Sequence, residues 1–159
     1  MFSIKILFRF ALLFLFLGLN SCKREKIDPS KITMRPKIYL QGASPIPLFD
    51  EYDIQSVQIG TVQNILSDDP SERVFAIWLS LDRRASFYLQ KETSGNLGRR
   101  LQLVINGQTL GIHPIERTIA NGVLPFILPT KMNENEARFL YEQLSQSILF
   151  IRAEMESKK

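Results

Sequence analysis

Apolar positions after residue 36 fall into short runs that predict β-strands. Residues 73–81 are apolar on both faces, as expected of a central strand that is covered on both sides. Residues 55–62 alternate between apolar and polar side chains, with Val57 and Ile59 on one face. The other strands that the pattern predicts are residues 37–41, 101–105, 109–112 and 123–128.

Turn residues indicate how these strands are connected. Asn106-Gly107 lies between residues 101–105 and 109–112, and both residues tolerate the positive φ that a two-residue hairpin requires. Pro114 follows the return strand and ends it, because proline cannot donate a main-chain hydrogen bond. We therefore expect an antiparallel hairpin in the sheet.

Two segments show helical spacing instead. Asp82 is a suitable N-cap for a helix over residues 83–92, and Asn133 with Glu136 forms a capping box for a long C-terminal helix. The apolar face of that second helix comprises Ala137, Leu140, Tyr141, Leu144, Ile148 and Ile151. Together the elements predict an α+β fold, in which two helices cover a mixed or antiparallel sheet.

The first 22 residues have the pattern of an export signal. Lys5 and Arg9 precede a short apolar run over residues 10–19, about half of the roughly 20 residues that a membrane-spanning helix needs. The run closes with Leu19-Asn20-Ser21-Cys22, which resembles the lipobox of bacterial lipoproteins. The resemblance implies cleavage between Ser21 and Cys22 and acylation of Cys22. The alternative is an uncleaved anchor beside a lone cysteine.

The chain then divides into four parts. Residues 1–21 are the expected lipoprotein signal peptide, and residues 22–36 are the lipidated cysteine with a flexible tether that is polar and broken by prolines. Residues 37–153 form a single α+β domain, and residues 154–159 form a charged tail. Removal of residues 1–21 leaves 138 residues, which suits one domain and a tether.

Charge gives no case for nucleic-acid binding. Loss of Lys5 and Arg9 with the signal reduces the 20 basic residues to 18, against 16 acidic residues. Three of these basic residues, at positions 23, 24 and 26, lie beside Cys22. They either attract an anionic headgroup layer or form a solvated tether. Because Cys22 is the only cysteine, an intrachain disulfide is excluded.

Candidate chemistry is sparse, and neither enzyme activity nor a cofactor is expected. His113 is the only histidine, which excludes a histidine-rich metal site, and its place beside a proline at a strand end indicates a structural role. Asp68 and Asp69 are adjacent in a loop and indicate a solvated turn rather than an acid–base pair or a calcium site. We therefore predict no catalytic residue and no metal ligand.

Binding features are more evident than catalytic ones. Arg83-Arg84 begins a helix, where the dipole disfavours positive charge, and Arg99-Arg100 follows a glycine turn. The two pairs form either a basic patch for an acidic ligand or two solvated pairs. An exposed sheet edge is a second option, because residues 37–41 or 124–128 can accept an extended peptide if they lie at such an edge.

A series of motifs follows in order over residues 74–147: Leu81-Asp82, Thr93-x-x-Asn96-x-Gly98-Arg99-Arg100-Leu101, Asn106-Gly107, Pro114-Ile115 and Asn135-Glu136-Ala137-Arg138. In order and residue type this segment resembles the small head portion of the first periplasmic domain of the SecD protein-export family. Two positions depart from the family, since Asn106 replaces the usual Asp and His113 replaces a small residue. The resemblance implies a compact periplasmic head that contacts exported polypeptides, without the transmembrane bundle on which the family's proton coupling depends.

The expected function follows from these features together. The chain is predicted to be a non-enzymatic envelope lipoprotein that attaches to the membrane through lipid on Cys22 and binds exported or envelope polypeptides. The alternative is a structural or surface-exposed lipoprotein that contacts host or envelope components. Lys23 stands where many inner-membrane lipoproteins have aspartate, which favours the outer membrane, with the domain periplasmic or surface-exposed.

Overall fold

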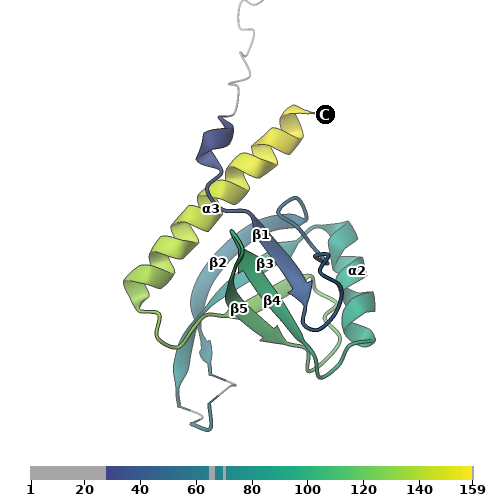
Figure 1. The fold of residues 1–159 in the computed structure, drawn as a ribbon, viewed down its shortest axis with the longest axis vertical. Coiled ribbons are helices and arrows are strands. Elements are labelled where there is room, and N and C mark those ends of the chain that lie inside the picture. Colours follow the sequence, from purple (N-terminus) through teal and green to yellow (C-terminus); the bar gives the residue numbers. More distant parts are fainter. Residues whose placement is uncertain (1–27, 65–66, 70, 159) are drawn as a thin grey trace, which may run out of the picture.

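The computed structural model describes residues 28–64, 67–69 and 71–158, so the predicted signal peptide, Ser21 and Cys22 lie outside the described residues. Six strands form one sheet in the order β1-β4-β5-β6-β3-β2, with antiparallel neighbours (Figure 1). The strands are β1 (Pro36–Leu40), β2 (Ile54–Gln63), β3 (Arg73–Leu81), β4 (Arg100–Ile105), β5 (Gln108–Pro114) and β6 (Val123–Ile127). The helices are η1 (Pro29–Lys31, a 3-10 turn), α2 (Arg83–Ser94) and α3 (Glu134–Ser157).

The predicted α+β fold is confirmed, and the sheet is antiparallel rather than mixed. Every predicted strand is present with bounds that agree within two residues. Among the described residues, none of the helices has the length and apolar character needed to cross a membrane.

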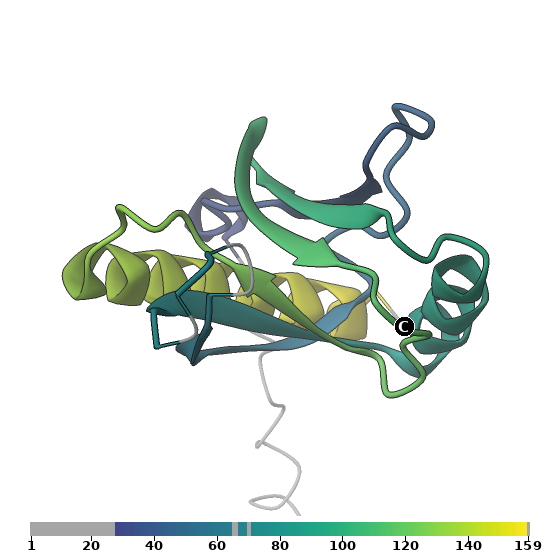
Figure 2. The same cartoon turned by 90° about the horizontal axis from the view of Figure 1, so that it is seen from below.

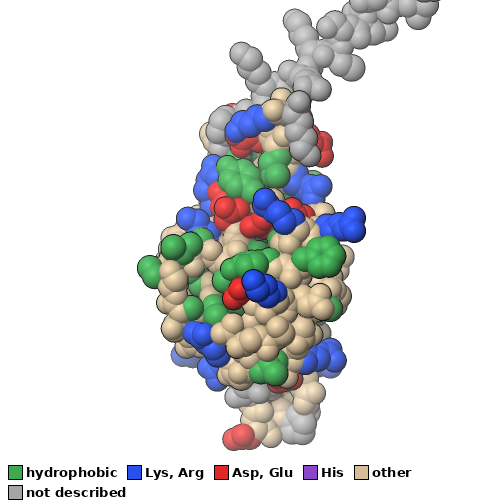
Figure 3. Space-filling model, turned by 90° about the vertical axis from the view of Figure 1, so that its right-hand side faces the viewer, with side chains coloured by type: hydrophobic (Ala, Val, Ile, Leu, Met, Phe, Trp, Pro, Cys, Tyr) green, Lys and Arg blue, Asp and Glu red, His purple; other side chains and the backbone are tan. Residues whose placement is uncertain are grey.

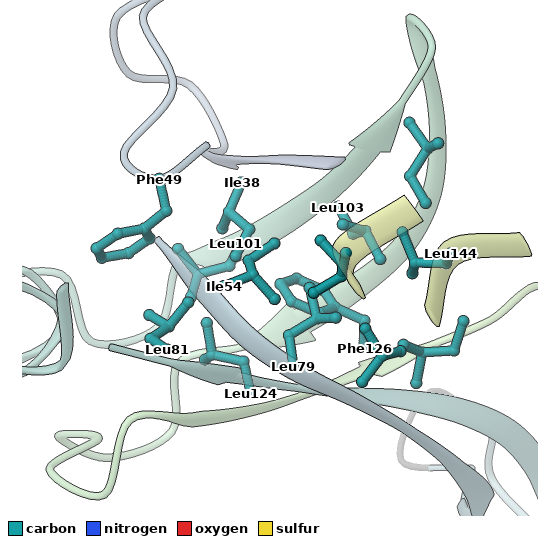
Figure 4. Packing of buried hydrophobic residues seen from close by; sticks show 14 of the residues in the cluster. Ile38, Phe49, Ile54, Leu79, Leu81, Leu101, Leu103, Leu124, Phe126 and Leu144 are labelled. Carbon is teal, nitrogen blue, oxygen red and sulfur yellow. The ribbon is translucent and has the colours of Figure 1, made fainter. Parts of the chain in front are cut away.

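The sheet is strongly curled. In Figure 2, β4 and β5 arch over β2 and β3, and α2 lies at one end of the space that they enclose. The core fills this space, where side chains from opposite parts of the sheet converge (Figure 4). Leu89 of α2 and Leu144 of α3 are fully buried in the same core, but only α3 packs along the sheet, against β2 and β3, whereas α2 closes one end of the enclosed space.

Both helices begin at the predicted caps. Asp82 Oδ1 accepts a hydrogen bond from Ala85 N at 2.7 Å, and Asn133 and Glu136 complete a reciprocal capping box. At its other end α3 continues through Ser157, so the expectation of a separate tail from residue 154 is wrong. Lys158 forms an ion pair with Glu154 at 2.6 Å, one turn back, which supports the last turn.

The described part of the predicted tether is not a free spacer. Residues 28–35 lie against α3, where the buried hydroxyl of Ser147 accepts hydrogen bonds from Thr33 N at 3.2 Å and Met34 N at 3.1 Å. Asn106 of the hairpin turn donates to Thr33 O at 2.9 Å. The tether prediction was therefore too long, because the partners of this segment lie far away in the sequence. We refer to residues 28–35 as the strap.

Gly122 provides a test of this packing. It has a φ of +68°, and a Cβ atom there would lie 2.0 Å from Ser86 Oγ on α2. Gly98 has a similar φ of +80° with open space around it, so it serves as a matched control. We expect Gly98→Ala to lower the free energy of unfolding by about 1 kcal/mol through backbone strain, and Gly122→Ala by at least about 2 kcal/mol more through overlap. Urea denaturation measures both values, and equal losses would contradict the close approach of α2.

Candidate binding pocket at a split in the sheet

The sheet splits between β5 and β6. Their register contains one pair, Ile112 with Ile127, whereas β3 and β6 pair at five positions. If that register continued, Pro114 would stand opposite Pro125.

Hydrogen-bond alternation explains the split. Main-chain groups point to alternate sides along a strand. Ile115 N donates to Arg99 O, so the main-chain groups of Pro114 point toward β6. Leu128 N donates to Phe75 O, so those of Pro125 point toward β5. Neither proline has an N–H, so the next pair of hydrogen bonds cannot form and the strands separate.

The His113 side chain replaces part of the missing ladder. Its Nδ1 lies 2.9 Å from Pro125 O, and its ring meets Phe126 edge-on with centroids 6.4 Å apart. A carbonyl can only accept, so the proton is assigned to Nδ1 and Nε2 remains an acceptor. Burial lowers the pKa of His113 below its ordinary value of 6.5, although the bond to Pro125 and the charge of Glu116 act in the opposite direction. The predicted structural role of His113 thus has a specific partner.

A pocket of about 630 Å³ opens where the two strands diverge. This volume is in the range of small-ligand sites. Its apolar lining comes from β3, β5, β6 and the loop between β5 and β6, through Trp78, Pro114, Ile119, Ala120, Val123 and Pro125. Glu116, Arg117 and Asn121 of the same loop supply polar groups.

One wall of the pocket is the flat ring of Trp78. A Cβ atom at Gly60 of the neighbouring strand would lie 2.9 Å from this ring, so the indole packs closely on the β2 backbone. Glycine at position 60 therefore permits the ring to lie there. Trp78 is the only tryptophan of the chain, which makes it a natural reporter for this pocket.

The loop that borders the pocket is fixed by α2 and its flanks. Ile119 N donates to the buried hydroxyl of Thr93 at 3.0 Å, and Gly98 N donates to Ile115 O at 2.8 Å. At the far end of the loop, Leu81 N donates to Gly122 O at 2.8 Å. The pocket is therefore preformed rather than assembled by a ligand.

The structure does not bring the two predicted arginine pairs into one patch. Arg83 lies over the ring of Phe87, and Arg84 forms an ion pair with Asp53 at 3.2 Å. The pair Arg99-Arg100 follows the other end of α2, whose 12 residues span about 18 Å. The face shown in Figure 3 accordingly carries basic side chains dispersed among other types.

Arg99 and Arg100 differ in their surroundings. Arg99 donates to Asn96 Oδ1 at 2.8 Å and to Gln41 O at 2.6 Å, so its guanidinium group holds the turn before β4. Arg100 is exposed and stands opposite Pro114 in the β4–β5 register, which places it beside the pocket wall.

The other predicted features are local. Asp69 accepts hydrogen bonds from the main-chain N and hydroxyl of Ser71, which lower the pKa of its carboxyl group. No cluster of three or more metal-ligating side chains occurs within the described residues.

Two strands were candidates for an exposed sheet edge. Strand β1 lies at an edge, but its Ile38 pairs with Phe49 in a β-bridge, whereas β6 lies inside the sheet between β5 and β3.

Comparison with known proteins gives distant similarities. No protein-family model and no curated protein matches the chain. Two solved structures of SecDF are similar over 68% of the chain, at 18% identity and a TM-score of 0.44. One is described as a membrane component that enhances protein export and is matched over 41% of its length; the other, the super-membrane-facing form, is matched over 12%. The chain spans less than half of either structure, and similarity at this level carries no argument about activity or partners.

His113 generates a prediction about stability and pH. Replacement by Phe removes the donor to Pro125 O and should lower the free energy of unfolding by about 1 kcal/mol, whereas Asn retains a donor near the Nδ1 position and should cost less. The pKa of His113 is lower in the folded protein, so the unfolded chain takes up the proton first. Its contribution to stability is therefore present above pH 6.5 and is lost as the pH falls through the folded pKa.

Urea denaturation at about pH 7.5 and about pH 5 measures this contribution. The loss of stability between the two pH values should be smaller in His113→Asn than in the wild type. The same loss in both proteins would show that His113 is not held neutral by its surroundings.

Proposed function

We propose that the protein is a non-enzymatic, lipid-anchored protein of the bacterial envelope whose domain binds an extended polypeptide segment in the pocket between β5 and β6. The observation that carries the proposal is the split itself, which leaves a preformed pocket with an apolar lining and polar groups at its border. Such a pocket accepts an apolar side chain while the border groups bind the main chain around it.

The polar groups suit a peptide backbone. The carbonyl of Pro114 points into the split and can accept from a peptide N–H, because no N–H of β6 reaches it. Arg117 and Asn121 supply side-chain donors for peptide carbonyls. The sequence resemblance of residues 74–147 to the SecD head implies the same class of partner.

A catalytic role for the pocket has less support. Among the described residues, the His113 ring is hydrogen-bonded to the Pro125 carbonyl and to no nucleophilic side chain, so no nucleophile–base pair is formed at this histidine. Glu116 is exposed and contributes charge rather than a positioned hydrogen bond to the ring. Binding without chemistry is the simpler assignment.

Peptide binding is testable through the fluorescence of Trp78. Titration with a reduced and alkylated, permanently unfolded protein should shift the emission to the blue as the pocket becomes covered. Ala120→Arg places a long side chain in the pocket and should weaken binding by at least about tenfold. Ala153→Arg, an exposed alanine on α3, is the matched control and should leave the affinity unchanged.

Equal affinities in the two variants would place the binding surface elsewhere. Absence of any binding in the wild type would favour the alternative of a structural lipoprotein.

The proposed anchor has its own test. Protein purified from its native membranes should have the mass of a chain that begins at Cys22 and carries acyl groups, and it should partition into detergent. Cys22→Ser should abolish both the mass increase and the partitioning. An unmodified chain of 159 residues would contradict the anchor.

A further inference from the structure

The strap fixes where the chain leaves the domain. Its main chain is hydrogen-bonded to Ser147, and Lys31 Nζ lies 5.2 Å from the ring centroid of Phe150, so η1 is held against the second half of α3. Figure 1 shows η1 and the C-terminal end of α3 together at one end of the molecule. A lipid attached upstream of the strap is therefore connected to this end of the domain.

The segment between the proposed lipid and the strap is short. Six Cα–Cα steps join Cys22 to Asp28, which extend to at most about 22 Å. A folded domain of this size has a radius of gyration of about 14 Å. The tether is thus shorter than the domain is wide, and the strap end of the domain stays near the bilayer.

The outer face of α3 at this end is unusual for a surface helix. From Gln143 to Ala153 the helix has one charged residue, Arg152, and its guanidinium group donates to Gln55 O of β2. Leu149 is 66% exposed and Phe150 is half-buried beside it. A surface helix ordinarily carries charged residues on its outer face, so an uncharged and partly apolar face indicates a partner.

The charges around this face are mixed, since Glu142 and Glu156 are exposed on α3 at its two ends. Two acidic residues at this end are paired, Glu51 with Arg35 and Glu154 with Lys158, each at 2.6 Å. The sequence over residues 23–31 has four basic and two acidic residues. Attraction to anionic headgroups therefore adds to the burial of apolar side chains.

We propose that the outer face of α3 from Gln143 to Ala153, together with the strap, is a docking surface for the headgroup layer of an anionic bilayer. This inference rests on the proposed acylation of Cys22. It goes beyond anchoring, because it assigns the domain one orientation on the membrane.

Site-specific quenching tests the orientation. An acylated Cys22 has no thiol, so Gln146→Cys introduces a single labelling site on the proposed surface and leaves Leu149 and Phe150 intact. Leu97→Cys, at a residue that is 57% exposed in the turn after α2, is the matched control on another side of the molecule. Each lipidated variant carries an environment-sensitive fluorophore and is reconstituted in phosphatidylcholine–phosphatidylglycerol vesicles containing lipids with a nitroxide on the headgroup.

Quenching at position 146 should be several-fold greater than at position 97, and Leu149→Glu in the Gln146→Cys background should reduce it toward the control value. Equal quenching at the two positions overturns the docking surface. A signal at position 146 that changes with protein density but not with the nitroxide lipid would assign this face to contact with a second copy of the chain. That result also overturns the docking surface.

Thiol titration distinguishes a failure of the docking surface from a failure of the proposed lipid anchor. Wild-type protein from native membranes with no reactive thiol confirms that Cys22 is blocked, so that a failed quenching experiment counts against the docking surface alone. One reactive thiol per chain overturns the anchor, and the docking surface with it.

Discussion

The missing hydrogen bonds between Pro114 and Pro125 determine the form of the candidate site. In the register set by Ile112 and Ile127, the next pair would require an N–H from each strand, and proline supplies none. The strands diverge at that point, while β5 remains paired with β4 and β6 remains paired with β3. A sheet continuous through Pro114 and Pro125 would leave no pocket between these strands. Two side chains in the right register thus convert an ordinary antiparallel sheet into one with a binding-sized opening.

The elements of the fold were predictable because their signals are local. Alternating apolar positions, the caps at Asp82 and Asn133, and Asn106 with its positive φ of 51° all act within a few residues. The strand order was not predictable in this way. Pro125 inside a predicted strand ordinarily argues against a place inside a sheet, yet it is accommodated here because its missing N–H faces the split. That explanation depends on which strand lies beside it, and the sequence does not state this.

The pocket escaped prediction for the same reason. Its lining comes from β3, β5, β6 and one loop, and no motif joins Trp78 to the residues after His113. Each arginine pair was a candidate because its two members are adjacent in sequence. In the structure α2 separates the two pairs, and the guanidinium group of Arg99 is hydrogen-bonded to Asn96 and Gln41. Clustering along the chain was therefore a poorer guide to the candidate site than the positions of two prolines whose partners are distant.

The positions of the strap and the pocket define an orientation of the domain in the proposed function. Ser147 holds the strap on α3, whereas Thr93 holds the pocket loop on α2, and Figures 1 and 2 show η1 and α2 on different sides of the molecule. A flexible tether would let a lipid-anchored domain turn freely, so a pocket would face any direction. The proposed tether is shorter than the domain and joins a strap fixed by partly buried hydrogen bonds, which restricts that rotation. In the proposed arrangement, the pocket faces the aqueous side of the membrane surface, where an unfolded polypeptide would reach it without competing with lipid.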